Sequence, residues 1–290
     1  MLKAIWFVPP ALATLAAQAA AAKGQTPLVQ GVATSSSDEQ FEALRDGRQD
    51  LAITAMDNVI MWNRRAGPAD FRIVAQLETT TGLKLVARPG LTRVSALAGG
   101  KLLVDSAVNG FVVALRTMLA DAGIAADGYT LVEAGGVRER FERLIGGEGN
   151  ATLLGPPFIG LANEQGFNAL VEADRAYPGF PGQGVVVRAG RLAQLHDPLV
   201  EWLTALEAAR SRAKQDPAQA ARTLADAGLA HQVAAAMVVA LGGTLEPSPV
   251  GIRILTEQRR ALGLPGEDDT YDKLVDLSLL NAIGARAVVI

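Results

Sequence analysis

Residues 27–58, which read PLVQGVATSSSDEQFEALRDGRQDLAITAMDN, contain a complete strand–loop–helix–strand unit. Residues 27–33 and 50–55 are short apolar runs, and each run predicts a buried strand. A loop of small polar residues follows each of the two runs. Strands that alternate with helices along the chain are typical of an α/β fold with a largely parallel sheet.

The helix inside this unit carries its own start and stop signals. Ser37 and Gln40 have the spacing of a capping box, in which the hydroxyl accepts a helix N–H group while the amide side chain reaches back. Phe41 and Leu44 continue its apolar face, and Gly47 predicts its end. We therefore expect Ser37 to cap this helix.

The same alternation recurs along most of the chain. The predicted strands are residues 2–8, 27–33, 50–55, 72–77, 83–87, 101–104, 129–133, 151–154 and 185–187. The main predicted helices are residues 10–22, 37–46, 109–119, 137–145 and 157–164. Beyond His196 the chain is nearly all helical, with helix starts expected at Asp197-Pro198 and Asp216-Pro217.

Length and composition narrow the class of protein. The chain has 290 residues, of which 49% are hydrophobic and 20% charged. Cores much beyond ~250 residues tend to split, so we expect two lobes. The net charge of −3 gives no global basic field, and we expect no nucleic-acid partner. With no cysteine, disulfides, thiolate metal sites and a cysteine nucleophile are excluded. No run approaches the ~20 apolar residues of a transmembrane helix.

The N-terminus allows two interpretations. Met1 to Ala17 resembles a signal peptide, and Ala17-Gln18-Ala19 resembles a cleavage site. Against this, Pro9-Pro10 interrupts the apolar run, and residues 2–8 have the pattern of a buried strand with Pro10 placed to begin a helix. The second interpretation is favoured, and it predicts that these residues belong to the folded core.

Small polar residues gather in the loops that follow the predicted strands. These loops contain Phe7-Val8-Pro9-Pro10, Thr34 to Ser37, Thr54 to Asn58, Asp105-Ser106-Ala107, Ala134-Gly135-Gly136 and Gly155 to Phe158. In open α/β sheets, ligands bind outside the carboxyl ends of the strands, where helix N-termini present free N–H groups. We therefore expect the binding site at these loops.

Three blocks of these residues resemble the nitrate/sulfonate/thiamine-precursor class of ABC-transporter substrate-binding proteins. The first runs from Ser35 through Phe41, Leu44, Gly47 and Asp50 to Ala55, and resembles their "SS…F…L…G…D…A" segment. The second, Leu97 to Gly110, is similar to their "L-x-G-K-x-(I/L)-x-V-D" entry to the second lobe. The third, Leu153 to Phe158, is similar to the end of that lobe. The blocks fall in family order and, with the helical tail, cover nearly the whole chain.

The resemblance implies a two-lobed type II periplasmic-binding fold and a solute-binding function. Lobe one would comprise residues 1–84 and 188–290, and lobe two residues 85–187, with a hinge near residues 83–89 and 182–188. The lobes would close over a small molecule and deliver it to an ABC-transporter permease, with no cofactor. It also implies a periplasmic or extracytoplasmic protein whose signal is absent from this chain or removed; a cytoplasmic location is the alternative.

The candidate ligand-binding residues come from the loops at the strand ends. They are Phe7, Pro9, Ser35, Ser36, Thr54, Met56, Asp57, Asn58, Ser106, Asn109, Gly135, Gly136, Pro156, Pro157 and Phe158. Several have a structural alternative. Asp57 could contact the ligand or cap a helix, Gly135-Gly136 could approach a ligand or a packed helix, and Phe158 could lie in the core.

Signals for catalysis are weak. The two histidines, His196 and His231, lie outside the loop set, and there is no G-x-S-x-G elbow, Walker loop or dinucleotide fingerprint. The rival hypothesis is an enzyme of lyase or decarboxylase type on the same fold. The basic residues from Arg138 to Arg143 have the pattern of a solvated helix face. With only Arg88 expected near the cleft, a highly charged anionic ligand is disfavoured.

Overall fold

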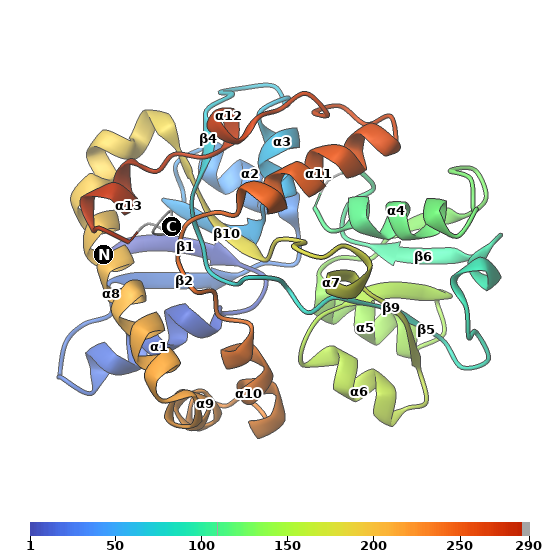
Figure 1. The fold of residues 1–290 in the computed structure, drawn as a ribbon, viewed down its shortest axis with the longest axis horizontal. Helices are drawn as coiled ribbons and strands as arrows, with labels where there is room; N and C mark the ends of the chain where they lie inside the picture. Colours follow the sequence, from blue (N-terminus) through green and yellow to red (C-terminus); the bar gives the residue numbers. More distant parts are fainter. Residues whose placement is uncertain (109, 286–290) are drawn as a thin grey trace.

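The computed structural model describes residues 1–108 and 110–285. Figure 1 shows two lobes side by side, one containing the N-terminal and C-terminal segments and the other the middle of the chain. Each lobe is built on a five-stranded sheet flanked by helices. The prediction of a two-lobed α/β fold is confirmed. No helix in the described ranges is long and apolar enough to cross a bilayer.

The first sheet contains the N-terminal strand in its interior. In spatial order its strands are β2 (Val29–Ala33), β1 (Leu2–Trp6), β3 (Leu51–Ala55), β10 (Gln183–Arg188) and β4 (Phe71–Gln76). β1 pairs in parallel with both β2 and β3, whereas β10 is antiparallel to its neighbours. The prediction that the first apolar run is a core strand is therefore confirmed.

The second sheet has the same number of strands and a similar mixed topology. In spatial order these are β7 (Thr130–Glu133), β6 (Lys101–Val104), β8 (Ala151–Leu154), β5 (Lys84–Ala87) and β9 (Asn168–Glu172). β6 is parallel to β7 and β8, and β5 is antiparallel to β8 and β9. β9 was not predicted from the sequence, because its apolar run is only the three residues Ala169, Leu170 and Val171.

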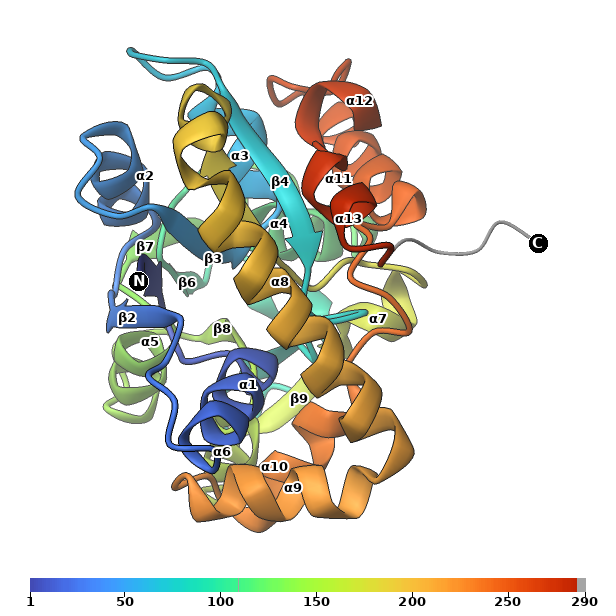
Figure 2. The ribbon, with the colours of Figure 1, turned by 90° about the vertical axis from the view of Figure 1, so that its left-hand side faces the viewer.

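Helices cover both sheets, and the C-terminal helices complete the first lobe (Figure 2). The helices of the first lobe are α1 (Ala11–Ala21), α2 (Ser37–Arg45), α3 (Asp57–Trp62), α8 (Leu192–Gln215), α9 (Pro217–Asp226), α10 (His231–Val239), α11 (Pro249–Ala261), α12 (Tyr271–Leu274) and α13 (Ser278–Ala282). Those of the second lobe are α4 (Val112–Asp121), α5 (Val137–Ile145), α6 (Phe158–Glu164) and α7 (Ala173–Ala176). Short 3₁₀ turns occupy Val94–Leu97 and Ala189–Arg191.

Two predicted helix starts are wrong. Ser36, not Ser37, caps α2, because its hydroxyl accepts the N–H groups of Asp38 and Glu39. Asp197-Pro198 does not begin a helix: α8 starts at Leu192 and continues through Pro198, which lies inside the helix and leaves the carbonyl four residues upstream without a helical N–H partner. The cap at Asp216 is confirmed by its bond from the Gln219 amide at 2.9 Å.

The chain crosses between the two sheets twice. Residues 77–83 connect β4 to β5, and residues 177–182 lead from α7 back to β10. Residues 185–187 were expected in the second lobe, whereas they pair with β3 and β4 in the first sheet. The expected lobe boundary at residue 188 therefore falls inside a first-lobe strand. The sequence does not indicate which sheet an antiparallel return strand joins.

Candidate functional site

A cavity of about 460 Å³ lies between the two lobes. The loops after β1, β3, β6 and β8 contribute to its wall, so it sits at the carboxyl ends of parallel strands from both sheets. The first crossing between the lobes and one face of α10 complete it. The position agrees with the expectation for an open α/β sheet, and both lobes supply the walls.

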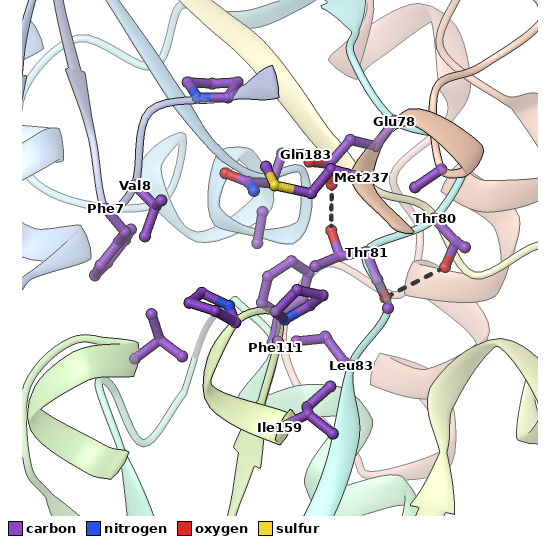
Figure 3. Close-up of a pocket in the computed structure, with 18 of the residues that line it drawn as sticks. Phe7, Val8, Glu78, Thr80, Thr81, Leu83, Phe111, Ile159, Gln183 and Met237 are labelled. Carbon is purple, nitrogen blue, oxygen red and sulfur yellow. Dashed lines mark hydrogen bonds between the residues drawn. The ribbon is translucent and has the colours of Figure 1, made fainter. Parts of the chain in front are cut away.

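Much of the wall is apolar. Figure 3 shows the side chains of Phe7, Val8, Leu83, Phe111, Ile159 and Met237 around the space. They come from the first strand loop, the first crossing, the start of α4, α6 and α10. An apolar wall with a few polar groups is typical of a pocket that takes up a small organic molecule.

The first lobe contributes a hydrogen-bonded pair of polar side chains to the wall. The Asn58 side-chain amide donates to the Thr54 hydroxyl over 2.7 Å, one turn apart at the end of β3 and the start of α3. Gly110 of the second lobe faces this pair: a Cβ added there would lie 3.0 Å from the Asn58 amide oxygen. The backbone at Gly110 has a φ of +75°, which favours glycine at this close approach. The lobes therefore meet beside the cavity.

Two basic side chains line the cavity, and both are paired. Arg140 is only 7% exposed, and its Nη1 lies 3.5 Å from Asp105 and also donates to the Gly135 carbonyl, while Nη2 donates to the Leu153 carbonyl. Lys84 lies 2.6 Å from Glu172. Burial lowers the pKa of Arg140 and raises the pKa of Asp105, and the attraction between the two charges opposes both shifts.

The interpretation of Arg138 to Arg143 as a solvated face is wrong for Arg140. The expectation that only Arg88 would bring a basic group near the cleft is also wrong, because Arg88 is exposed and does not line the cavity. The α5 face that carries Arg140 turns toward β8, and this packing decides its burial.

Glu78 lies on the first crossing and also lines the cavity. It accepts a hydrogen bond of 3.0 Å from the Thr81 hydroxyl (Figure 3). Burial raises the pKa of the Glu78 carboxyl, and hydrogen bonds from Thr81 and Gln183 act in the opposite direction. Gln183 opens β10, so the carboxylate stands where the two crossings between the lobes run together.

Asp57 forms a buried ion pair rather than part of the cavity wall. Its carboxylate oxygens bind Nε and Nη2 of Arg259 at 2.6 and 2.5 Å, and the Gly110 amide donates to it at 2.9 Å. Both side chains are 1% exposed or less. Burial raises the pKa of the Asp57 carboxyl, while Arg259 and the amide oppose that shift. Since Arg259 also donates to the Val108 carbonyl at 3.4 Å, the pair bonds to the second lobe.

The structure brings six of the fifteen predicted residues into the cavity wall. They are Phe7, Pro9, Thr54, Asn58, Pro156 and Pro157. Ser35 instead faces an adjoining cavity of about 450 Å³, which it shares with Phe7 and Pro9. Ligand contact by these residues stays a prediction.

Five others lie in structural surroundings away from the cavity. Ser36 caps α2, and the Met56 and Asp57 side chains, which directly follow β3, are buried. Ser106 is 5% exposed and accepts the Val108 amide at 3.4 Å. Phe158 packs on Phe141 with ring centroids 5.3 Å apart. Asn109 lies outside the described residues.

Gly136 allows the lobes to approach one another, whereas Gly135 lies against a side chain of its own lobe. A Cβ added at Gly136 would lie 3.0 Å from the Phe7 ring and 3.2 Å from the Ser35 backbone, which are both in the first lobe. A Cβ on Gly135 would meet the Glu139 side chain at 3.1 Å. Of the two alternatives offered by the sequence, a ligand or packed protein, the structure places packed protein beside these two glycines.

Several wall residues were missed by sequence reasoning. Glu78, Thr80 and Thr81 belong to a polar run between two apolar strands, and that run was a usable signal. The α10 residues Gln232 and Met237 carried none, because they reach the cavity only through the folding of the C-terminal helices onto the first lobe. Neither histidine lines the cavity, and the described residues contain no cluster of three potential metal ligands.

Comparison by sequence and by structure gave different results. No protein-family model matches the chain, and the search of curated proteins found no match. Solved structures do resemble it over nearly its whole length.

The ligand-binding component of an ABC-type import system from Staphylococcus aureus, with zinc bound, is 15% identical with a TM-score of 0.78, covering 97% of both chains. The alkanesulfonate-binding protein SsuA from Xanthomonas axonopodis pv. citri, bound to MOPS, is 17% identical with a TM-score of 0.72, covering 91% of this chain and 93% of its own. The periplasmic nitrate-binding protein NrtA from Synechocystis PCC 6803 is 16% identical with a TM-score of 0.76, covering 98% and 88%. The chain has the type II periplasmic-binding fold, the fold of the SsuA- and NrtA-type substrate-binding proteins of ABC import systems.

Proposed function

We propose that the protein is a solute-binding protein that captures a small organic molecule between its lobes and presents it to an ABC-transporter permease. The observation that carries the proposal is the cavity of about 460 Å³ whose wall comes from both lobes. A molecule held there contacts two bodies that are joined by two short crossings, so binding favours the arrangement in which both bodies touch it.

The boundaries of the moving bodies follow from the strands. We assign residues 1–76 and 183–285 to lobe one and residues 84–176 to lobe two, with the crossings at 77–83 and 177–182 as the hinge. Short segments that connect two sheets can absorb the backbone rotation that closure needs.

The structural relatives support this choice of function and its location. Of the proteins named above, the Staphylococcus aureus protein is described as a component of an ABC-type import system and NrtA as periplasmic. On that analogy we place the protein outside the cytoplasm, where it would meet its solute before the transporter does. The polar groups at the strand ends and the apolar wall suit reversible capture.

Closure is the first expected result. Native mass spectrometry of the protein as purified should reveal a bound small molecule, which can be extracted, identified and added back to stripped protein. Addition should reduce the radius of gyration in small-angle scattering and raise the melting temperature, since a ligand at a hundred times its Kd stabilises by ~2.7 kcal/mol.

The same measurement tests the rival enzyme function. A binding protein returns the compound unchanged after long incubation, whereas a lyase or decarboxylase converts it to products of different mass. Tight binding with an unchanged radius of gyration would contradict the hinge, and conversion of the compound would contradict the transport role.

A further inference from the structure

We propose that the cavity selects a ligand with a protonated amine or amidine head, held by the carboxylate of Glu78, on an apolar body. This inference rests on the proposed binding function and names the chemical class of the solute.

The proposal rests on the charged side chains that line the cavity. Four charged side chains line the cavity: Glu78, Lys84, Asp105 and Arg140. Arg140 pairs with Asp105, and Lys84 pairs with Glu172 just outside the wall. Within residues 1–108 and 110–285, no lysine, arginine or histidine forms an ion pair with Glu78. Among the described residues of the wall, the Glu78 carboxylate therefore has no ion-pair partner, whereas both basic side chains, Lys84 and Arg140, have one.

The position of Glu78 is also that of a ligand-binding group. Its polar neighbours are the Thr81 hydroxyl and Gln183, and none of them brings a positive charge. The apolar Leu83 and Met237 side chains line the same cavity (Figure 3). A carboxylate in apolar surroundings is costly unless it is paired, so a ligand cation supplies what the protein does not. Burial already raises the pKa of this carboxyl, consistent with a site that lacks its counter-charge.

The charges of the cavity wall disfavour a ligand with an anionic head group. Such a group would approach Glu78, and each basic group within reach already has a carboxylate partner and, in the case of Arg140, two carbonyl partners. Breaking the pair with Arg140 would leave the buried Asp105 carboxylate uncompensated. The wall thus favours a cation over a sulfonate or carboxylate of the same shape.

The location of Glu78 also couples recognition to closure. It stands on the first crossing, and Gln183 stands at the end of the second. A Cβ added at Gly182 would lie 2.5 Å from the Glu78 carbonyl oxygen, so the two crossings touch here. A head group bound at this point lies at the hinge, with its apolar body between Phe111 and Ile159 of the second lobe and Met237 of the first.

Matched probes test the proposal. Benzylamine and benzamidine are the cationic probes, benzenesulfonate and benzoate the anionic ones, and benzyl alcohol the neutral one. Their affinities for wild-type protein and for Glu78→Gln are measured by calorimetric titration. We expect the cations to bind more tightly than the anions of the same ring. We expect Glu78→Gln to weaken the cations by roughly ten- to a hundredfold, because a hydrogen bond to a charged group is lost.

A second readout separates a binding role from a structural one. Glu78→Gln keeps the size of the side chain and one acceptor oxygen but removes its charge, so the melting temperature without ligand should fall by little. Glu164→Gln, on the exposed end of α6, is the control and should change neither affinity nor melting temperature.

Three outcomes would overturn the amine assignment: tighter binding of the anions, cation affinity that is equal in wild type and Glu78→Gln, or binding of no probe at all. In each case a compound recovered from the purified protein that still closes the lobes would leave the proposed function standing. If no compound closes the lobes, the proposed function itself fails.

Discussion

Replacing Asp57 by asparagine is expected to destabilise the protein by ~3–5 kcal/mol, because the Arg259 guanidinium is left buried without its counter-charge. Asparagine has nearly the same volume, so the loss reflects charge and not a cavity. The pair is 1% exposed or less, and the Gly110 amide loses a charged acceptor as well. Urea denaturation monitored by circular dichroism measures the change in the free energy of unfolding.

The matched control lies on the same helix as Arg259. Arg253 pairs with Glu257 at 3.8 Å on the exposed side of α11, and Arg253→Ala should change stability by no more than ~1 kcal/mol, as expected for a surface pair. The double variant Asp57→Asn, Arg259→Met should recover much of the loss, since both charges are then removed. If the single and double variants lost the same stability, the ion pair would not be the cause.

Deleting residues 1–19 is expected to abolish folding. The deletion removes β1, which pairs on both sides within the first sheet, and most of α1. Leu2, Ile5 and Leu12 are each 2% exposed or less. Truncating a buried leucine or isoleucine to alanine costs ~2–5 kcal/mol, so the loss of three is comparable to the ~5–15 kcal/mol that holds a typical domain together. Expression trials and thermal melts of the shortened chain measure the result.

Two point variants within the strand make the same test without truncation. Ile5→Asp places a carboxylate in the core and should also prevent folding. Lys3→Gln changes the exposed face of the same strand and should shift stability by no more than ~0.5 kcal/mol. A soluble deletion product with a cooperative melt would mean that these residues are dispensable, as for a signal peptide.

Local sequence patterns determined the class of fold and the region of the site. Apolar runs and helix caps are set by residues close together in the chain, so the N-terminal strand and most of the alternation were predicted correctly. The rule that ligands bind at the carboxyl ends of strands also placed Phe7, Thr54, Asn58 and Pro156 in the wall of the cavity, because strand direction follows from the order of elements.

The partners of the charged side chains were decided only by the tertiary structure. Asp57 lies in a polar loop after a strand, a position that predicts a ligand contact. Its actual partner is Arg259, which is 202 residues away in the sequence. Arg140 belongs to a charged helix that predicts a solvated face, and the packing of that helix on β8 buries it. Whether a charge is neutralised depends on which distant segments fold against it, since burial and pairing are properties of the packed chain. For the same reason the sequence alone does not indicate that, in the part of the chain that the structure describes, Glu78 is the charged side chain of the cavity wall without an ion-pair partner.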